Sequence, residues 1–182
     1  MNYQILVNKD NKYEKQDFQN EKLVSYTNSL GEEIILERRT LQAFLNLQKE
    51  FTTDIKLDID SGYRSLEEQD EINNLYKEYA APSGFSEHHT GLAFDLFLID
   101  KDKNILENEE MLSDKYIDFW KKVEKKAYRC GLILRYPKDK ESVTGYTYEP
   151  WHYRYVGTKI ASYIKKHNIT YDEYYVMFLQ QD

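Results

Sequence analysis

One apolar segment, residues 92–99, constrains the fold of this chain more than any other part of its sequence. Its apolar side chains recur at every second position, as they do on one face of a β-strand: Leu92, Phe94, Leu96 and Leu98. Asp95 is then predicted on the opposite face, between a small residue and an aromatic one. A carboxylate in that position is costly to bury without a partner, so we expect either a metal ion or a basic side chain beside it.

The rest of the chain mixes strand and helix patterns without a regular strand–helix–strand rhythm. Further strands are predicted over residues 3–7, 33–36, 56–61, 132–136 and 151–156. Helices are predicted over residues 37–51, 65–79, 114–130, 159–167 and 172–179. The second helix begins at a capping box and carries an apolar stripe: Ser65 and Glu68, then Leu66, Ile72, Leu75 and Tyr79. This mixture predicts an α+β domain with a central, largely antiparallel sheet flanked by helices.

The composition limits the kinds of site that the chain can build. Cys130 is the single cysteine, so internal disulfides and thiolate-rich zinc sites are excluded. Any transition metal must therefore be held by the four histidines and by carboxylates. The net charge of −7, without a basic run, excludes nucleic acid as a partner.

The length of the chain predicts the number of domains, and the search for targeting signals predicts where in the cell the protein lies. The 182 residues fit one domain over residues 1–182. No segment approaches the ~20 apolar residues of a membrane span. Residues 1–20 contain no apolar run long enough for an export signal, so we expect a cytoplasmic protein, or an extracellular one if a natural leader is missing from the sequence. The sequence does not predict the oligomeric state.

Two clusters contain the histidines of interest. His88 ends a predicted loop over residues 81–90, and Gly91 permits a sharp turn that would bring His88 back towards Asp95. Taken alone, His88 is more simply interpreted as a hydrogen-bonded loop histidine. Glu149 and His152 lie on opposite faces of an unbroken strand and converge only if the chain bends at the intervening proline. The alternative for Glu149 is a surface Glu–Arg pair beside a core tryptophan.

A third cluster, residues 60–65, lies at a strand end with Gln69 one helical turn further on. Arg64 either points into a cleft from there or is a plain surface arginine. Together, two histidines and one aspartate would leave a fourth zinc position open, which is typical of a catalytic site. A nearby glutamate would then suit a general base, and an arginine would suit the stabilisation of an oxyanion.

The three clusters resemble the motifs of a known family. Residues 86–95 contain S-x-H-x-x-G-x-A-x-D, residues 149–157 contain E-P-W-H-x-R-Y-V-G, and residues 61–65 read S-G-Y-R-S upstream of Gln69. This pattern, within residues 57–157, resembles the VanY-type D-alanyl-D-alanine carboxypeptidases, zinc peptidases of the LAS-fold group that also contains VanX dipeptidases. The resemblance implies a LAS-type (hedgehog/D,D-peptidase-like) fold, with residues 158–182 as C-terminal helices.

The resemblance also implies roles for individual residues. One Zn²⁺ ion would be bound by His88, Asp95 and His152. Glu149 would be the base, and Arg64 would polarise the scissile carbonyl. The substrate peptide would be held by Ser86, Gln69, Tyr63 and Trp151. His89 stands where such enzymes often have glutamine, a difference that bears on local substrate contacts, and the register of the motif makes His88 the expected ligand instead of His89.

The implied function is hydrolysis of the terminal D-Ala-D-Ala bond of peptidoglycan precursors. The short chain without an export signal is most similar to VanXY-type enzymes, which act on both the dipeptide and the pentapeptide and support glycopeptide resistance. Alternatives within the enzyme class are an L,D-carboxypeptidase acting on tetrapeptide stems and a phage-type L-alanyl-D-glutamate endopeptidase. Two non-enzymatic alternatives are a wall-peptide binding module and a tyrosine-rich interaction domain.

Overall fold

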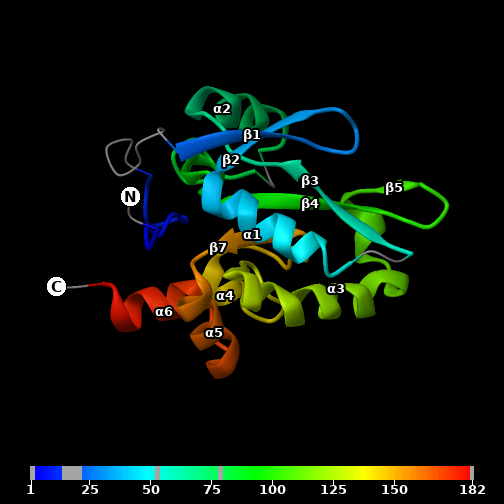
Figure 1. Ribbon diagram of the computed structural model, residues 1–182. Coiled ribbons are helices and arrows are strands. Elements are labelled where there is room, and N and C mark those ends of the chain that lie inside the picture. The colour runs from blue at the N-terminus through cyan, green and yellow to red at the C-terminus, as the bar shows by residue number, and fades with distance from the viewer. Residues whose placement is uncertain (1–2, 14–21, 52–53, 78–79, 181–182) are drawn as a thin grey trace.

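An antiparallel sheet organises the chain in the computed structural model, which describes residues 3–13, 22–51, 54–77 and 80–180. Four strands lie in the order β3, β4, β7, β6 (Figure 1), with these bounds: Lys56–Ser61, Ala93–Ile99, His152–Tyr155 and Leu132–Leu134. The short strand β5, Ile105–Leu106, also pairs with β4. All of these pairings are antiparallel, as predicted.

Strand β4 lies at the centre of the sheet and determines where the site forms. On one side it pairs with β3, so that Asp95 lies opposite Ser61 after a register shift between Ile59 and Ser61. On the other side it pairs with β7, so that Asp95 lies opposite His152. The register therefore brings the histidine cluster and the arginine loop to the same carboxylate.

The two faces of β4 differ as the alternation predicts. Phe94, Leu96 and Leu98 are buried in the main hydrophobic core. Two long helices cover this face, α1 (Arg38–Gln48) and α3 (Asp114–Ala127), as Figure 1 shows. Their inner side chains complete the core: Ala43, Phe44 and Leu47 from α1, and Tyr116, Trp120, Val123 and Ala127 from α3. On the opposite face, Asp95 lies between two buried apolar residues, Ala93 and Phe97.

The hairpin of β1 (Leu23–Thr27) and β2 (Glu33–Glu37) leads directly into α1. Glu37 caps that helix by accepting the backbone N–H groups of Arg39 and Thr40. Helix α2 (Leu66–Leu75) begins at the predicted capping box of Ser65 and Glu68. Helix α3 is followed by a 3-10 turn and by Gly131 in the left-handed region, as the sequence indicates.

The C-terminal part adds α4 (Glu141–Thr144), α5 (Thr158–His167) and α6 (Tyr171–Phe178). Residues from α5 and α6 form a second hydrophobic cluster with Leu6 of the N-terminal segment. The two ends of the chain consequently lie on the same side of the molecule (Figure 1). In the described part of the chain, no helix has both the length and the apolar character needed to cross a membrane.

Two predictions about local structure are wrong. The segment 3–7 is not a strand, because the Arg154 guanidinium binds the carbonyls of Tyr3 and Ile5 in place of a neighbouring strand. The apolar stripe predicted on the second helix is wrong at Leu75, although Leu66 is half-buried and packs against a hydrophobic cluster. Leu75 is 76% exposed and the buried residue of α2 is Gln69, while Tyr79 lies outside the described residues. The strand β1 was not predicted at all.

Truncating a side chain in the core should lower the stability of the protein far more than truncating one on the exposed surface of a helix. Phe44 of α1 is fully buried, and its ring packs edge-on against Phe94, with centroids 5.7 Å apart. We expect Phe44→Ala to lower the free energy of unfolding by about 3–5 kcal/mol through a cavity. Leu75→Ala, on an exposed helix position, should change it by less than about 0.5 kcal/mol. Urea unfolding of both variants measures this, and equal losses would contradict the assignment of the core.

Candidate metal centre and catalytic cleft

A short 3-10 helix, Glu87–Thr90, carries His88 to the polar face of the sheet. The side chain of Ser86 caps it by accepting the backbone N–H of His88. Gly91 ends it in the left-handed region, with φ of 63°. A Cβ at Gly91 would also lie 3.2 Å from the backbone nitrogen of Glu37, which is a tight contact, so glycine suits this position for its backbone conformation and for its small size. The predicted sharp turn is confirmed.

His88 is held in one orientation by the backbone just after strand β3. Its Nδ1 lies 2.6 Å from the Gly62 carbonyl oxygen, which can only accept, so Nδ1 donates the hydrogen. The lone pair of Nε2 then points at Asp95 Oδ2, 3.2 Å away. Burial, together with the charge of Arg64, lowers the pKa of His88 to about 4. The ring is therefore neutral at pH 7 and can bind a metal.

His152 reaches the same carboxylate from strand β7. Its Nδ1 lies 2.8 Å from Asp95 Oδ1, and its ring stands at 78° to that of His88. Burial alone would raise the pKa of Asp95, but the two histidines hold it well below its usual range. Burial alone would lower the pKa of His152, but Asp95 raises it to about 9.

His88, Asp95 and His152 fit a single metal ion. One ligand atom from each lies within 4.8 Å of the others, and no other such group occurs among the residues that the structure describes. Two imidazoles and one carboxylate form the donor set of a zinc site that keeps a fourth position open. His88 Nε2 and His152 Nδ1 lie 3.2 and 2.8 Å from oxygens of Asp95, so both nitrogens face the same carboxylate.

Arg64 contacts this cluster and is not a surface arginine. Its side chain is 19% exposed, and its Nη2 lies 3.0 Å from Asp95 Oδ2. Nε donates to Ser61 and Nη1 to Gln69. Asp95 thus has both of the partners that its burial suggested, a basic side chain and a candidate metal site.

His89 positions the loop around Arg64. Its Nδ1 donates to the Arg64 carbonyl over 2.8 Å, and its Nε2 accepts the Gly84 N–H over 3.0 Å. Because both ring nitrogens are used in this way, His89 is outside the metal cluster.

Glu149 approaches the cluster because the chain bends at Pro150. The His152 N–H donates to the Glu149 carbonyl over 3.2 Å and closes a turn. As a result Glu149 Oε2 lies 3.8 Å from His152 Nδ1. Burial raises the pKa of Glu149 to about 7, which suits a group that takes up and releases a proton at neutral pH. The alternative surface pair is not formed with Arg154, which binds Glu87.

These side chains line a cavity of about 130 Å³. Nearly all the predicted site residues reach it: Arg64, Gln69, Ser86, His88, Asp95, Glu149, Trp151 and His152. Tyr63 lies outside this set and donates its backbone N–H to the Ile35 carbonyl. A second cavity of about 660 Å³ shares Ala80, Ala81, Tyr146 and Glu149 with the first, so the two cavities adjoin at the glutamate.

Three residues at the site were not predicted. The Tyr136 ring packs against His152, with centroids 4.8 Å apart, and Tyr146 packs against Tyr136. Glu87 is fully buried behind His152 and pairs with Arg135 and Arg154. The signal for Glu87 was its place between Ser86 and His88 in the motif, although nothing in the sequence shows which arginines it meets.

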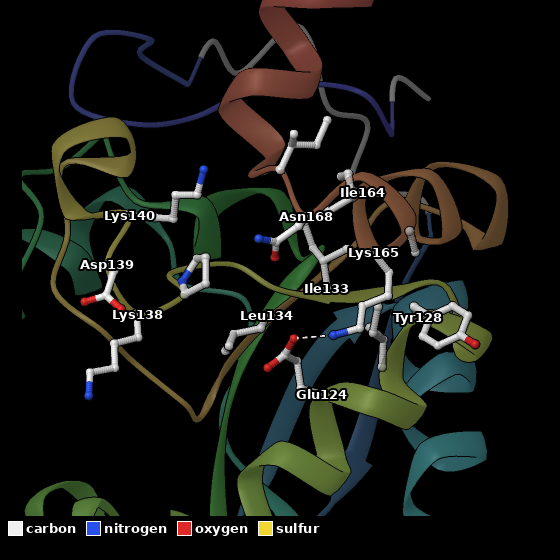
Figure 2. A pocket seen from close by; sticks show the side chains of 14 residues that line it. Glu124, Tyr128, Ile133, Leu134, Lys138, Asp139, Lys140, Ile164, Lys165 and Asn168 are labelled. Atoms are coloured by element: carbon white, nitrogen blue, oxygen red, sulfur yellow. Dashed lines mark hydrogen bonds and ion pairs between the residues drawn. The ribbon is translucent and has the colours of Figure 1, made fainter.

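A separate cavity of about 260 Å³ lies between α3, α5 and the loop after β6 (Figure 2). Glu124 of α3 and Lys165 of α5 meet there at 2.6 Å, so their charges are paired. None of the cluster residues lines this cavity. The candidate site is therefore the cleft at the histidines.

Comparison with known proteins agrees with this geometry. The family model described as "VanY: D-alanyl-D-alanine carboxypeptidase" matches residues 33–158, which include the whole cluster. This chain belongs to the VanY family. A D-alanyl-D-alanine carboxypeptidase of Enterococcus faecium is 39% identical over 117 residues, covering 64% of this chain and 35% of that protein. The chain thus spans about a third of that relative's length.

Solved structures share the fold. A mutant of the vancomycin resistance D,D-pentapeptidase VanY, in complex with Zn(II), is 29% identical with a TM-score of 0.73, covering 94% of this chain and 98% of that one. The LD-carboxypeptidase LdcB is 34% identical with a TM-score of 0.75, covering 94% of this chain and 84% of that one. These matches confirm the predicted LAS-type α+β fold.

The cluster predicts how zinc content responds to substitution. We expect the purified protein to hold about one equivalent of zinc after reconstitution, and His88→Ala to hold less than about half an equivalent because one of three ligands is gone. His167→Ala, on the last turn of α5 and away from the cluster, is the matched control and should keep the full equivalent. Elemental analysis after desalting measures this. Equal zinc contents in the two variants would rule out His88 as a ligand.

Proposed function

We propose that this chain is a zinc-dependent D,D-carboxypeptidase that removes the terminal D-Ala from D-Ala-D-Ala-ended peptidoglycan peptides. The observation that carries the proposal is the placement of Glu149 and Arg64 beside a two-histidine, one-aspartate cluster. Membership of the VanY family and the Zn(II) complex of a VanY relative support the reaction and the metal. His88, Asp95 and His152 would hold the ion.

When bound there, zinc would lower the pKa of a coordinated water towards ~7 and polarise the scissile carbonyl. Glu149 lies within reach of that position and would accept the proton of the attacking water. It would then deliver the proton to the leaving amine of the terminal D-Ala. A buried carboxylate with a pKa near 7 is suited to both steps, because it is readily protonated and deprotonated at neutral pH.

Arg64 would stabilise the negative charge that develops on the carbonyl oxygen. It is fixed in place by Asp95, Ser61 and Gln69, so little reorganisation is needed during the reaction. Gln69 also donates to the Ala81 carbonyl over 2.7 Å. Its amide is thus engaged at both ends, and Gln69 supports the cleft mainly by holding Arg64 and the adjacent loop. Ser86 and Trp151 remain the lining residues proposed to contact substrate.

The shape of the cleft favours a peptide longer than a dipeptide. The cavity of about 130 Å³ at the cluster adjoins the cavity of about 660 Å³, because four lining residues are common to both. The larger cavity would receive the part of the peptide on the amino side of the scissile bond. Lys9 and Lys77 line it, which suits an acidic peptide stem. We therefore propose the pentapeptide as a better substrate than free D-Ala-D-Ala.

An L,D-carboxypeptidase acting on tetrapeptides is the second candidate. The likeness to LdcB favours it, at 34% identity and a TM-score of 0.75. The two activities use the same metal chemistry and differ in the configuration accepted on the amino side of the bond.

Removal of the proposed base should separate catalysis from metal binding. We expect Glu149→Gln to lower kcat by at least about 10³-fold, because the amide cannot accept the proton of the water. Its zinc content should equal that of the wild type, since Glu149 is not a proposed ligand. Glu141→Gln, on the exposed start of α4, is the control and should retain full activity. Full turnover by Glu149→Gln would eliminate Glu149 as the base.

A substrate series decides between the two candidates and tests the role of the larger cavity. D-Ala release would be measured from free D-Ala-D-Ala, from a pentapeptide ending in D-Ala-D-Ala and from a tetrapeptide ending in one D-Ala. We expect kcat/KM for the pentapeptide to exceed that for the dipeptide by about tenfold or more, because contacts remote from the bond contribute to the transition state. A pentapeptide ending in L-Ala-L-Ala, from which release of L-Ala would be measured, is the control. Preference for the tetrapeptide would select the L,D activity.

A further inference from the structure

Glu87 is a buried carboxylate that the proposed reaction does not use. Its side chain is fully buried, which is costly for a charged group unless it is well paired. One oxygen, Oε1, accepts two hydrogen bonds of 2.9 Å each, from Arg135 Nε and from Arg154 Nη1. Both arginine side chains are themselves fully buried. The charges of the two arginines lower the pKa of Glu87 despite its burial, so it remains ionised.

The second oxygen of Glu87 points at a metal-cluster residue. Oε2 lies 3.7 Å from Nε2 of His152, and within the described residues neither of these buried atoms has a hydrogen-bond partner. A separation of 3.7 Å is slightly too long for a hydrogen bond. Two unpartnered polar atoms therefore face each other at the rear of the cluster, where an unsatisfied group carries a free-energy cost.

The tautomer of His152 explains this arrangement. Nδ1 is the nitrogen that faces Asp95 and the candidate metal position. A metal on Nδ1 uses that lone pair, so the single ring proton must then be on Nε2, directed at Glu87. His88 has the equivalent arrangement, since its Nδ1–H donates to the Gly62 carbonyl while Nε2 faces the cluster. Each histidine thus has a separate acceptor for its second nitrogen.

We propose that Glu87 is a positioning residue: it accepts the Nε2–H of His152 and so fixes this histidine as an Nδ1 ligand of the metal. The inference rests on the metal site of the proposed function. Carboxylate–histidine–metal arrangements of this kind orient the ring and increase its basicity as a ligand. The two arginines complete the arrangement, because they occupy Oε1 and leave Oε2 free for His152.

A purely structural role for Glu87, as the counter-ion of two arginines, is the competing explanation. Asp172 of α6 provides the matched control, because it also pairs with Arg135, at 2.5 and 3.1 Å, and is largely buried. Asp172 has no contact with His152 in the described structure. Neutralising either carboxylate disturbs the same arginine, but only Glu87 faces the metal ligand.

The experiment compares Glu87→Gln with Asp172→Asn. Glutamine keeps the shape of glutamate but has a single carbonyl oxygen, which would accept the hydrogen bonds of the two arginines. Its NH₂ group would then face the Nε2–H of His152, and two donors cannot form a hydrogen bond. Zinc affinity is measured by competition with a chromophoric chelator, and the visible spectrum of the Co²⁺-substituted protein reports ligand geometry. We expect Glu87→Gln to bind zinc about 10–100-fold more weakly and to show an altered cobalt spectrum. Asp172→Asn should stay within about threefold of wild type and keep its spectrum, although both variants unfold at lower temperature.

Each outcome has one meaning. Wild-type zinc affinity in Glu87→Gln, or equal losses in both variants, would overturn the positioning role and leave the metal site intact. A wild-type protein that binds no zinc would instead refute the proposed metal site itself. Should Glu87→Gln not fold, the wild-type zinc form still gives an answer by ¹H–¹⁵N NMR of its histidines. We expect His152 to carry a solvent-protected proton on Nε2, and a proton on Nδ1 would overturn the proposal.

Discussion

The ionised carboxylate of Asp95, buried within the central sheet, is the constraint on which the rest of the site depends. Its desolvation is compensated by two basic groups, Arg64 and His152, each delivered by a different segment, while His88 faces it from a third segment. The pairing of β4 with its two neighbours brings these groups together, because Asp95 lies opposite Ser61 of β3 and opposite His152 of β7. A one-residue slip of either strand would move the polar side chains to the opposite face, so the register of the sheet determines the chemistry.

The same carboxylate connects the folding of the chain to its proposed reaction. The face of β4 opposite Asp95 packs against α1 and α3, which hold the strand rigidly in place. Loops alone would position the ligands less accurately than a central strand does. In the proposed enzyme, Arg64 is aligned by the same residue that binds the metal, so the metal ligand and the oxyanion stabiliser are set by one interaction.

Local patterns were sufficient to predict the parts of the fold that depend on neighbouring residues. The alternation in residues 92–99, the capping box at Ser65 and the turn at Gly91 all appear as expected. Segment 3–7 was mispredicted because its carbonyls bind Arg154, about 150 positions away in the chain. The role of Glu87 was not predicted for the same reason. Its partners are Arg154 of β7 and Arg135, directly after β6, and a buried ion pair between distant segments produces no periodic pattern in the sequence.

The buried network of charged side chains also connects the site to both terminal segments of the chain. From Glu87, the network runs through Arg135 to Asp172 of α6, and Asp172 accepts a hydrogen bond from Asn8 near the other end of the chain. Residues 33–158, which match the family, contain every proposed ligand but neither Asn8 nor Asp172. A fragment trimmed to those bounds would lack Asp172, one of the two carboxylates that pair with Arg135. The terminal segments are thus part of the framework of the cleft, although neither contributes a residue to the metal cluster.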